Sequence, residues 1–297
     1  MEDYIVRAMA AEGAVRAFAA VTTNMAQEAR NVHKSSGVAT AALGRTLTAA
    51  AIMGRMSKGE RDQLTIQIRG DGPIGGIIAV SDSNSNVRGY VYNPEIYLPL
   101  NESGKFDVSS AVGKGYLNVI KDFGLKEPYI GYVDLVSGEI GEDIAYYYAY
   151  SEQVPSVVSL GVLIAPDENV VNAGGFIIQL LPGADDSLVE YLEDRVSRTP
   201  PITALLSEGK SPEEILDVLL GEKDLTVTEK YPCRYVCNCS RDRMERNLVS
   251  LGRKELISLA DEQHGAELQC HFCNQKYSFT EEEILELAQF SENDSKS

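Results

Sequence analysis

Four cysteines near the C-terminus, arranged as two tight pairs, constrain this chain more than any other feature. The first pair has the sequence Cys-Asn-Cys at residues 237–239, and the second has Cys-His-Phe-Cys at residues 270–273. Two thiolate pairs separated by a longer segment supply the soft ligands of a tetrahedral zinc ion. The sequence therefore predicts one zinc ion per chain in the reduced state, bound by Cys237, Cys239, Cys270 and Cys273.

The short spacing of the first pair makes redox chemistry an alternative to a purely structural metal. Neighbouring thiols can join in a disulfide once the metal leaves, and metal binding holds them as the thiolates that oxidants attack. Residues 233–297 also form a small module, for which zinc ligation is worth roughly 10–16 kcal/mol. Because a whole domain is typically stable by ~5–15 kcal/mol, loss of zinc should unfold the module. These residues are compatible with both a purely structural zinc ion and a zinc ion that is released on oxidation, and both interpretations stay open.

The residues around the cysteines fit a metal site. Ser240 is placed to cap a helix over residues 241–251, which Gly252 ends. The helix dipole and its arginines would offset the negative charge of a four-thiolate site. Cys233 would be a fifth ligand and is interpreted as a spare thiol. His271 is not needed as a ligand, because four cysteines already satisfy zinc. The arginines in question are Arg241, Arg243 and Arg246.

The composition of the 297 residues excludes several classes of protein. The net charge is −17, whereas a protein that binds nucleic-acid phosphates needs a basic face. The first residues lack the basic start and apolar core of a signal peptide, and no stretch is long and apolar enough to span a membrane. We therefore expect a cytoplasmic protein with no nucleic-acid or membrane partner, where clustered cysteines serve metal or redox chemistry.

Hydrophobic periodicity predicts an α+β fold for residues 1–182, with strands predominating and helices on one side. The helix over residues 38–56 is rich in alanine, and its small residues permit close packing against a sheet or another helix. The predicted strands are two within 4–23, an antiparallel meander over 63–92, and four more at 115–121, 129–136, 156–165 and 173–181; further helices are expected in 24–34 and 141–152.

Residues 183–232 are predicted to form a helical linker arm between this core domain and a zinc-binding domain at 233–297. Three short helices are expected within 185–221, and Ser211 with Glu214 forms a capping box for the third. A strand over 224–228 would lead to the cysteines. The helices carry one apolar stripe and an acidic face, although an ordinary peripheral subdomain is an alternative interpretation.

Several motifs imitate nucleotide or catalytic sites without meeting their requirements. The Gly-x-Gly-x-x-Gly pattern at 70–75 lies in a predicted hairpin, with no helix to receive a pyrophosphate. The Gly-Lys-Ser at 209–211 lacks the first glycine of a P-loop and a preceding strand. There is no Gly-x-Ser-x-Gly elbow, and the three histidines suggest no triad. Tyrosines at 146–148 and 150 are expected to pack beside a sheet rather than bind a ligand.

The whole chain resembles the bacterial redox-regulated heat-shock holdases, the thirty-three-kilodalton chaperone family. The combination of a Cys-x-Cys pair with a Cys-x-x-Cys pair is highly specific, and other stretches agree with it in order. These stretches are LGRT at 43–46, GDGPIG at 70–75, VRGY at 87–90, SEQVPS at 151–156, AGGF at 173–176 and CNCSR at 237–241.

This resemblance implies an ATP-independent chaperone that is inactive while reduced and zinc-bound. It implies that peroxide with heat, or hypochlorite, oxidises the thiolates, releases zinc and pairs Cys237 with Cys239 and Cys270 with Cys273. The C-terminal module and then the linker would lose order, exposing surface that holds unfolding client proteins. The resemblance further implies that the core domain binds clients and that the active form is a homodimer.

Other functions stay open as alternatives. One is a zinc-stabilised protein whose four-cysteine site is purely structural, attached to an unidentified binding or enzymatic domain. A zinc-dependent nucleic-acid module is argued against by the acidic charge, and an enzyme using Asp71 or the tyrosines has no recognisable motif. We therefore expect a protein that is not an enzyme and has no catalytic residues.

Overall fold

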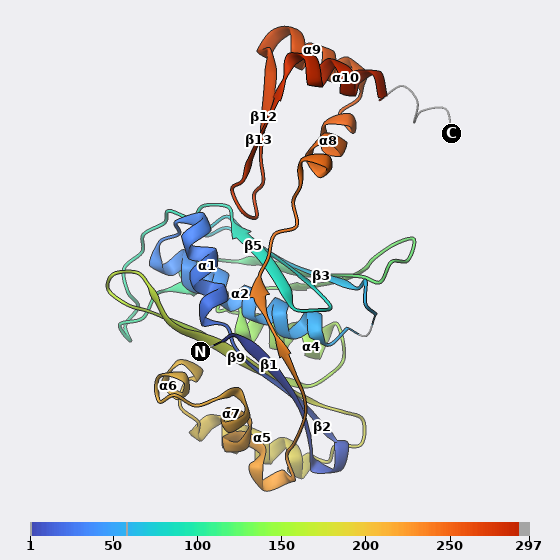
Figure 1. The fold of residues 1–297 in the computed structure, drawn as a ribbon. Coiled ribbons are helices and arrows are strands. Elements are labelled where there is room, and N and C mark those ends of the chain that lie inside the picture. The colour runs from blue at the N-terminus through green and yellow to red at the C-terminus, as the bar shows by residue number, and fades with distance from the viewer. Residues whose placement is uncertain (1, 58, 291–297) are drawn as a thin grey trace. The chain divides into compact units, whose positions relative to one another are not determined.

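The computed structural model describes residues 2–57 and 59–290 and confirms the predicted α+β class. It divides into two compact units, Met1–Val236 and Cys237–Ser297 (Figure 1). Residues 183–232 belong to the first unit, where they pack against its sheet, rather than forming a unit of their own.

The first unit contains two sheets, which are five- and six-stranded among the described residues. All neighbouring strands are antiparallel except β11 and β5, and the predicted hairpin, meander and later strands are confirmed. The first sheet has the order β10 (Thr226–Pro232), β1 (Tyr4–Ala10), β2 (Val15–Val21), β9 (Val170–Leu180), β8 (Ser156–Ile164). The second has the order β11 (Arg234–Tyr235), β5 (Asn86–Val91), β4 (Gly76–Asp82), β3 (Gln63–Gly70), β6 (Gly115–Asp122), β7 (Tyr129–Asp134).

The alanine-rich helix α2 (Gly37–Arg55) lies between the two sheets, so the prediction of helices on one side only was wrong. Every residue from Gly37 to Gly54 except Arg45 is buried. A Cβ added at Gly89 in β5 would lie 2.9 Å from Leu47, and one added to Gly44 would lie 2.8 Å from Val162 in β8. The small residues therefore let α2 contact both sheets closely, as their composition suggested.

Three short helices cover the opposite face of the five-stranded sheet, and their prediction from the sequence is confirmed. They are α5 (Asp186–Arg198), α6 (Ile202–Ser207) and α7 (Pro212–Leu220). Ser211 and Glu214 form the expected capping box at the start of α7. Apolar side chains of these helices form one buried cluster with the sheet, comprising Val6, Ala8, Ala10, Val15, Ala17, Ala19, Phe176, Ile178, Leu188, Leu192, Ile202, Leu205, Ile215, Leu216, Leu219 and Leu220.

The remaining helices of the first unit are α1 (Thr23–His33), α3 (Val108–Val112) and α4 (Gly141–Tyr150). The tyrosines of α4 divide between two environments. Tyr147 and Tyr148 are buried, whereas Tyr146 and Tyr150 stack on each other at the surface. The prediction of core packing thus holds for half of the cluster. The glycine motif at 70–75 forms the turn between β3 and β4, as predicted.

The second unit contains three helices and a hairpin among its described residues. Helix α8 (Arg241–Val249) follows the sequence prediction, and helix α9 (Arg253–Gln263) comes after it. The hairpin β12 (Gly265–Gln269) and β13 (Lys276–Thr280) and helix α10 (Glu281–Phe290) were not predicted. The unit has its own small apolar core, which includes Leu256, Phe279 and Ile284.

Among the described residues, no helix combines the length and apolar character needed to cross a bilayer.

The burial of α2 generates a stability prediction. Replacing Leu47, which is fully buried, with alanine should lower the free energy of unfolding by about 2–5 kcal/mol, because it leaves a cavity between α2 and β5. The matched control is Leu125→Ala at a side chain that is 72% exposed. Urea denaturation followed by circular dichroism measures both. Equal losses for the two variants would contradict the placement of α2 between the sheets.

Candidate metal centre

The first cysteine pair lies between β11 and helix α8. Ser240 caps α8, because its Oγ accepts a hydrogen bond from the backbone N–H of Arg243 at 3.2 Å. This cap fixes the start of the helix directly after Cys239, as the sequence predicted. The backbone N–H of Cys239 donates a hydrogen bond to the sulfur of Cys237, so the two residues form one compact turn.

The second cysteine pair occupies the tip of the hairpin formed by β12 and β13. The N–H of Cys270 donates to the carbonyl of Gln275 at 2.9 Å, and the N–H of Asn274 donates back to the carbonyl of Cys270 at 2.8 Å. Asn274 closes the turn with φ +58°, a left-handed conformation that asparagine tolerates. Sequence reasoning missed the hairpin, although Leu268 and Tyr277 belong to stretches of alternating polarity that could have revealed it.

The structure brings the four predicted cysteines together. All four sulfur atoms lie within 4.8 Å of one another. The Cys237 and Cys270 sulfurs are 3.7 Å apart, and those of Cys239 and Cys273 are 3.3 Å apart. A tetrahedral ion with metal–sulfur bonds of about 2.3 Å requires sulfur–sulfur separations of about 3.8 Å. The four side chains are therefore positioned to hold a metal ion of this size, while their role as ligands stays a prediction.

The thiols of the cluster differ in how readily they ionise. Burial raises the pKa of Cys237 to about 11, and burial together with hydrogen bonds from neighbouring thiols raises the pKa of Cys273. Burial also acts on Cys239, but hydrogen bonds from Tyr277 and the other thiols outweigh it and lower the pKa of Cys239. Because metal binding requires deprotonated thiols, an ion entering this cluster displaces protons.

Tyr277 is a residue of the site that sequence reasoning missed. Its hydroxyl lies 3.1 Å from the sulfur of Cys239, and this hydrogen bond to a group that becomes negative raises the pKa of Tyr277 to about 12. The phenol is therefore a hydrogen-bond donor to the cluster at neutral pH. Hydrogen bonds of this kind orient ligands and adjust the charge on the sulfur. Its position in β13 is apparent only once the hairpin is known.

Two of the three arginines expected to offset the thiolate charge, Arg241 and Arg243, have other partners. Arg241 pairs with Glu283 at 2.6 Å and with Glu245 at 3.5 Å, and it lies over the ring of Phe279. Arg243 contacts the side chain of Asn238 rather than a sulfur. Carboxylates on α8 and α10 thus compete with the sulfurs for Arg241. The sulfurs accept hydrogen bonds from the backbone N–H groups of Cys239 and Gln275 and from the hydroxyl of Tyr277.

Cys233 lies in the first unit and is not part of the cluster, in agreement with its interpretation as a spare thiol. It is buried, and its sulfur lies 3.7 Å from the carbonyl oxygen of Val21. Burial, with the nearby charge of Asp3, raises the pKa of Cys233, so the thiol stays protonated at neutral pH. His271 lies in the second turn but is not grouped with the four sulfurs.

Comparison with known proteins gives a consistent answer over the length of the chain. A sequence model of the family described as Hsp33 protein matches residues 3–280. The 33 kDa chaperonin of Acetivibrio thermocellus is 61% identical over 293 residues, covering 99% of each chain. That of Ruminiclostridium cellulolyticum is 57% identical, covering 96% of this chain and 97% of the relative.

A solved structure agrees with these relatives. The crystal structure of the 33 kDa chaperonin (heat shock protein 33 homolog) from Thermotoga maritima is 40% identical in sequence and superimposes with a TM-score of 0.91. The match covers 99% of this chain and 100% of that one. Fold and sequence therefore agree over nearly the whole chain, and the chain belongs to the Hsp33 protein family.

Proposed function

We propose that this Hsp33-family chaperone is a redox-regulated, ATP-independent holdase that binds unfolding proteins under oxidative and heat stress. The reduced, zinc-bound form is inactive, and disulfide formation with zinc release activates it. The observation that carries this proposal is the gathering of four thiols, without other ligand types, in one small unit. Relatives named 33 kDa chaperonin support the chaperone role.

The proposed chemistry needs only the four thiols and an oxidant. Zinc, when bound, supplies a charge that holds the sulfurs as thiolates. A thiolate attacks peroxide and becomes a sulfenic acid, with release of hydroxide; a neighbouring thiol then displaces water from it to form the disulfide. Each disulfide thus consumes one peroxide and yields two waters. A disulfide sulfur is no longer a charged ligand, so the oxidised cluster loses its affinity for zinc.

The chain connects this cluster directly to the segment that covers the five-stranded sheet. Only Val236 separates β11 from Cys237, and its N–H donates to the carbonyl of Val87 at 2.8 Å. Upstream, β10 pairs with β1 along the sheet edge. Helices as short as α6 and α7 are marginal alone and depend on docking. Disorder that spreads from the cluster through β11 and β10 would therefore free these helices and the apolar face beneath them.

The assignments of the three regions follow from this mechanism. Residues 1–182 form the core that binds clients and dimerises in the active state, residues 183–232 act as the releasable arm, and residues 233–297 are the switch. The net charge of −17 keeps the complex with a client in solution. The protein acts in the cytoplasm, where thiols stay reduced until stress, and it has no enzymatic activity, nucleic-acid partner or membrane partner.

The ligand assignment predicts the effect of single substitutions. Cys239→Ser should weaken zinc binding by more than about tenfold, since even loss of an outer hydrogen-bonding partner costs 10–100-fold. Cys233→Ala removes a thiol outside the cluster and should leave zinc at one per chain. Metal analysis after competition with a chelator measures both variants. Full zinc retention by Cys239→Ser would exclude that cysteine as a ligand.

The switch predicts a coupled response to oxidation. Peroxide at elevated temperature should release zinc, remove four free thiols and raise the suppression of client aggregation without ATP. Peptide mapping should find Cys237 joined to Cys239 and Cys270 joined to Cys273. The close contacts between Cys239 and Cys273 make cross-pairing the competing result. Equal suppression before and after oxidation, or zinc retention, would favour a purely structural metal.

Release of the arm predicts a local change in backbone protection. After oxidation and zinc release, amides of residues 185–221 should exchange with solvent at least about tenfold faster, because their helices lose the docking that stabilises them. Amides of α2 should keep their protection, since α2 is held between the two sheets. Hydrogen-exchange mass spectrometry measures both regions in one experiment. Unchanged exchange in 185–221 would show that the arm stays docked.

A further inference from the structure

Strand β8 is an edge of the five-stranded sheet, with no strand on its outer side within the described part of the chain. The backbone of residues 157–164 has no hydrogen-bond partner among the described groups other than β9. Edge strands are usually protected against further pairing by charged residues or proline. The opposite edge, β10, contains Glu229, Lys230 and Pro232, whereas β8 has the sequence SVVSLGVLI and contains neither kind of residue.

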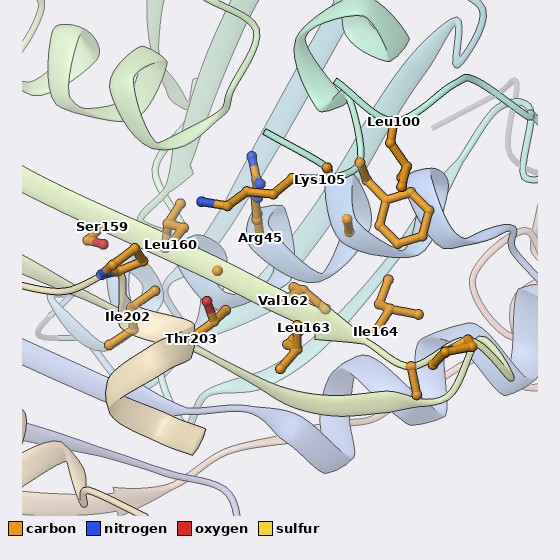
Figure 2. A pocket seen from close by; sticks show the side chains of 17 residues that line it. Arg45, Leu100, Lys105, Ser159, Leu160, Val162, Leu163, Ile164, Ile202 and Thr203 are labelled. Atoms are coloured by element: carbon orange, nitrogen blue, oxygen red, sulfur yellow. The ribbon is translucent and has the colours of Figure 1, made fainter. Parts of the chain in front are cut away.

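A cavity of about 520 Å³ follows this unprotected edge. Residues 159–166 line it continuously. Arg45 of α2 and Lys105 of the loop between β5 and α3 lie on one side of the strand, and Ile202 and Thr203 at the start of α6 lie on the other (Figure 2). The cavity is therefore an elongated groove with β8 as its floor.

The charges in the groove favour a negatively charged occupant. Its lining includes two cations and no carboxylate. Arg45 is partly neutralised by an ion pair with Glu139, but Lys105 forms no ion pair with any described residue. Figure 2 shows the two basic side chains close to each other, with Leu100 further along the groove. The groove therefore has one cationic end and is otherwise mainly apolar, although the protein as a whole has a net charge of −17.

We propose that the β8 groove binds an extended peptide segment, which adds to the sheet as a further strand and places an acidic group near Lys105. Strand addition satisfies the free N–H and C=O groups of β8, while side-chain pockets provide the preference for sequence. A second copy of this chain fits less well, because its β8, with the sequence SVVSLGVLI, brings no carboxylate into the groove to pair with Lys105.

This inference rests on the proposed holdase function. It adds that, in the β8 groove, a client segment is bound in extended form as a further strand. The start of α6 closes one wall of the groove, because a Cβ added at Gly161 would lie 2.6 Å from Ile202 and 2.7 Å from Thr203. Release of the arm would therefore expose the other face of β8 to longer segments. The groove itself is present in the closed structure, so short peptides bind before oxidation.

The test uses the reduced, zinc-loaded protein and a fluorescein-labelled peptide of the same length as β8. The peptide alternates valine and threonine and carries one central glutamate. Fluorescence anisotropy should detect saturable binding, and hydrogen exchange should show new protection within residues 157–164. A version with two central prolines lacks the N–H groups needed for pairing and should not bind. Binding of the proline peptide with equal affinity would overturn strand addition.

Charge variants test the position of the acidic group. Lys105→Glu should weaken binding by roughly three- to tenfold, as expected for replacing an exposed ion pair by repulsion. The matched control is Lys126→Glu, at an exposed lysine that does not line the groove, and it should keep the affinity unchanged. Equal effects of the two variants would overturn the assignment of Lys105.

The outcomes separate this inference from the holdase proposal. Peptide binding is measured before oxidation, so absence of zinc release would undermine the redox switch and leave the groove intact. Absence of binding and of protection in 157–164 would remove the groove as a client site, whether or not oxidation activates the protein. A concentration-dependent dimer that protects 157–164 without peptide would assign the edge to self-association and overturn the proposal.

Discussion

The five-stranded sheet is apolar on both faces, and this constraint organises the first unit. Alternate residues of β1 and β2 point to opposite sides, so Ile5 and Phe18 join the core around α2 while Val6 and Ala17 join the cluster under α5 to α7. Burying a side chain such as leucine or isoleucine contributes about 1.5–3 kcal/mol. Neither face can be left in water without loss of that stabilisation, so the sheet requires a cover on each side.

The two covers differ in how firmly they are held. Helix α2 is enclosed between two sheets and cannot leave without opening the whole unit. The outer cover consists of short helices that contact one face of one sheet and continue into β10 and β11. The Asp185 cap of α5 and the capping box of Ser211 and Glu214 at α7 stabilise these two helices locally by about 0.5–2 kcal/mol per cap, whereas α6 begins after Pro201 without a side-chain cap. Under the proposed mechanism, such a cover would stay folded only while both of its ends are held, which would suit it to controlled release.

Much of this arrangement could be predicted from the sequence, because local patterns such as alternating polarity and helix caps agree with the structure that tertiary packing favours. The alternation of Leu64, Ile66 and Ile68 gave the meander, and Ser240 gave the start of α8. The position of α2 could not be predicted, since an alanine-rich helix fits equally well beside one sheet or between two. The partners of Arg241 depend on carboxylates of α10, which is distant in sequence. Tyr277 became part of the site only through the hairpin that places it beside Cys239.

The second unit ties its stability to the same atoms that would react with an oxidant. Cys270 is a buried member of its small apolar core, and Cys237, Cys239 and Cys273 pack against that core. In a larger domain a four-cysteine site could be lost with little damage, because many other contacts would remain. Here the buried apolar side chains are few, and small units of this kind usually need a metal or disulfides to fold.

Oxidation would replace one metal cross-link, which joins four residues, by two disulfides that each join near neighbours in sequence. Short disulfide loops constrain the chain far less than a cluster that spans residues 237–273, because the loop-closure entropy that a cross-link removes grows with loop length. The physical basis of the proposed switch is therefore the replacement of long-range cross-linking by local cross-linking, in a unit with too small a core to compensate.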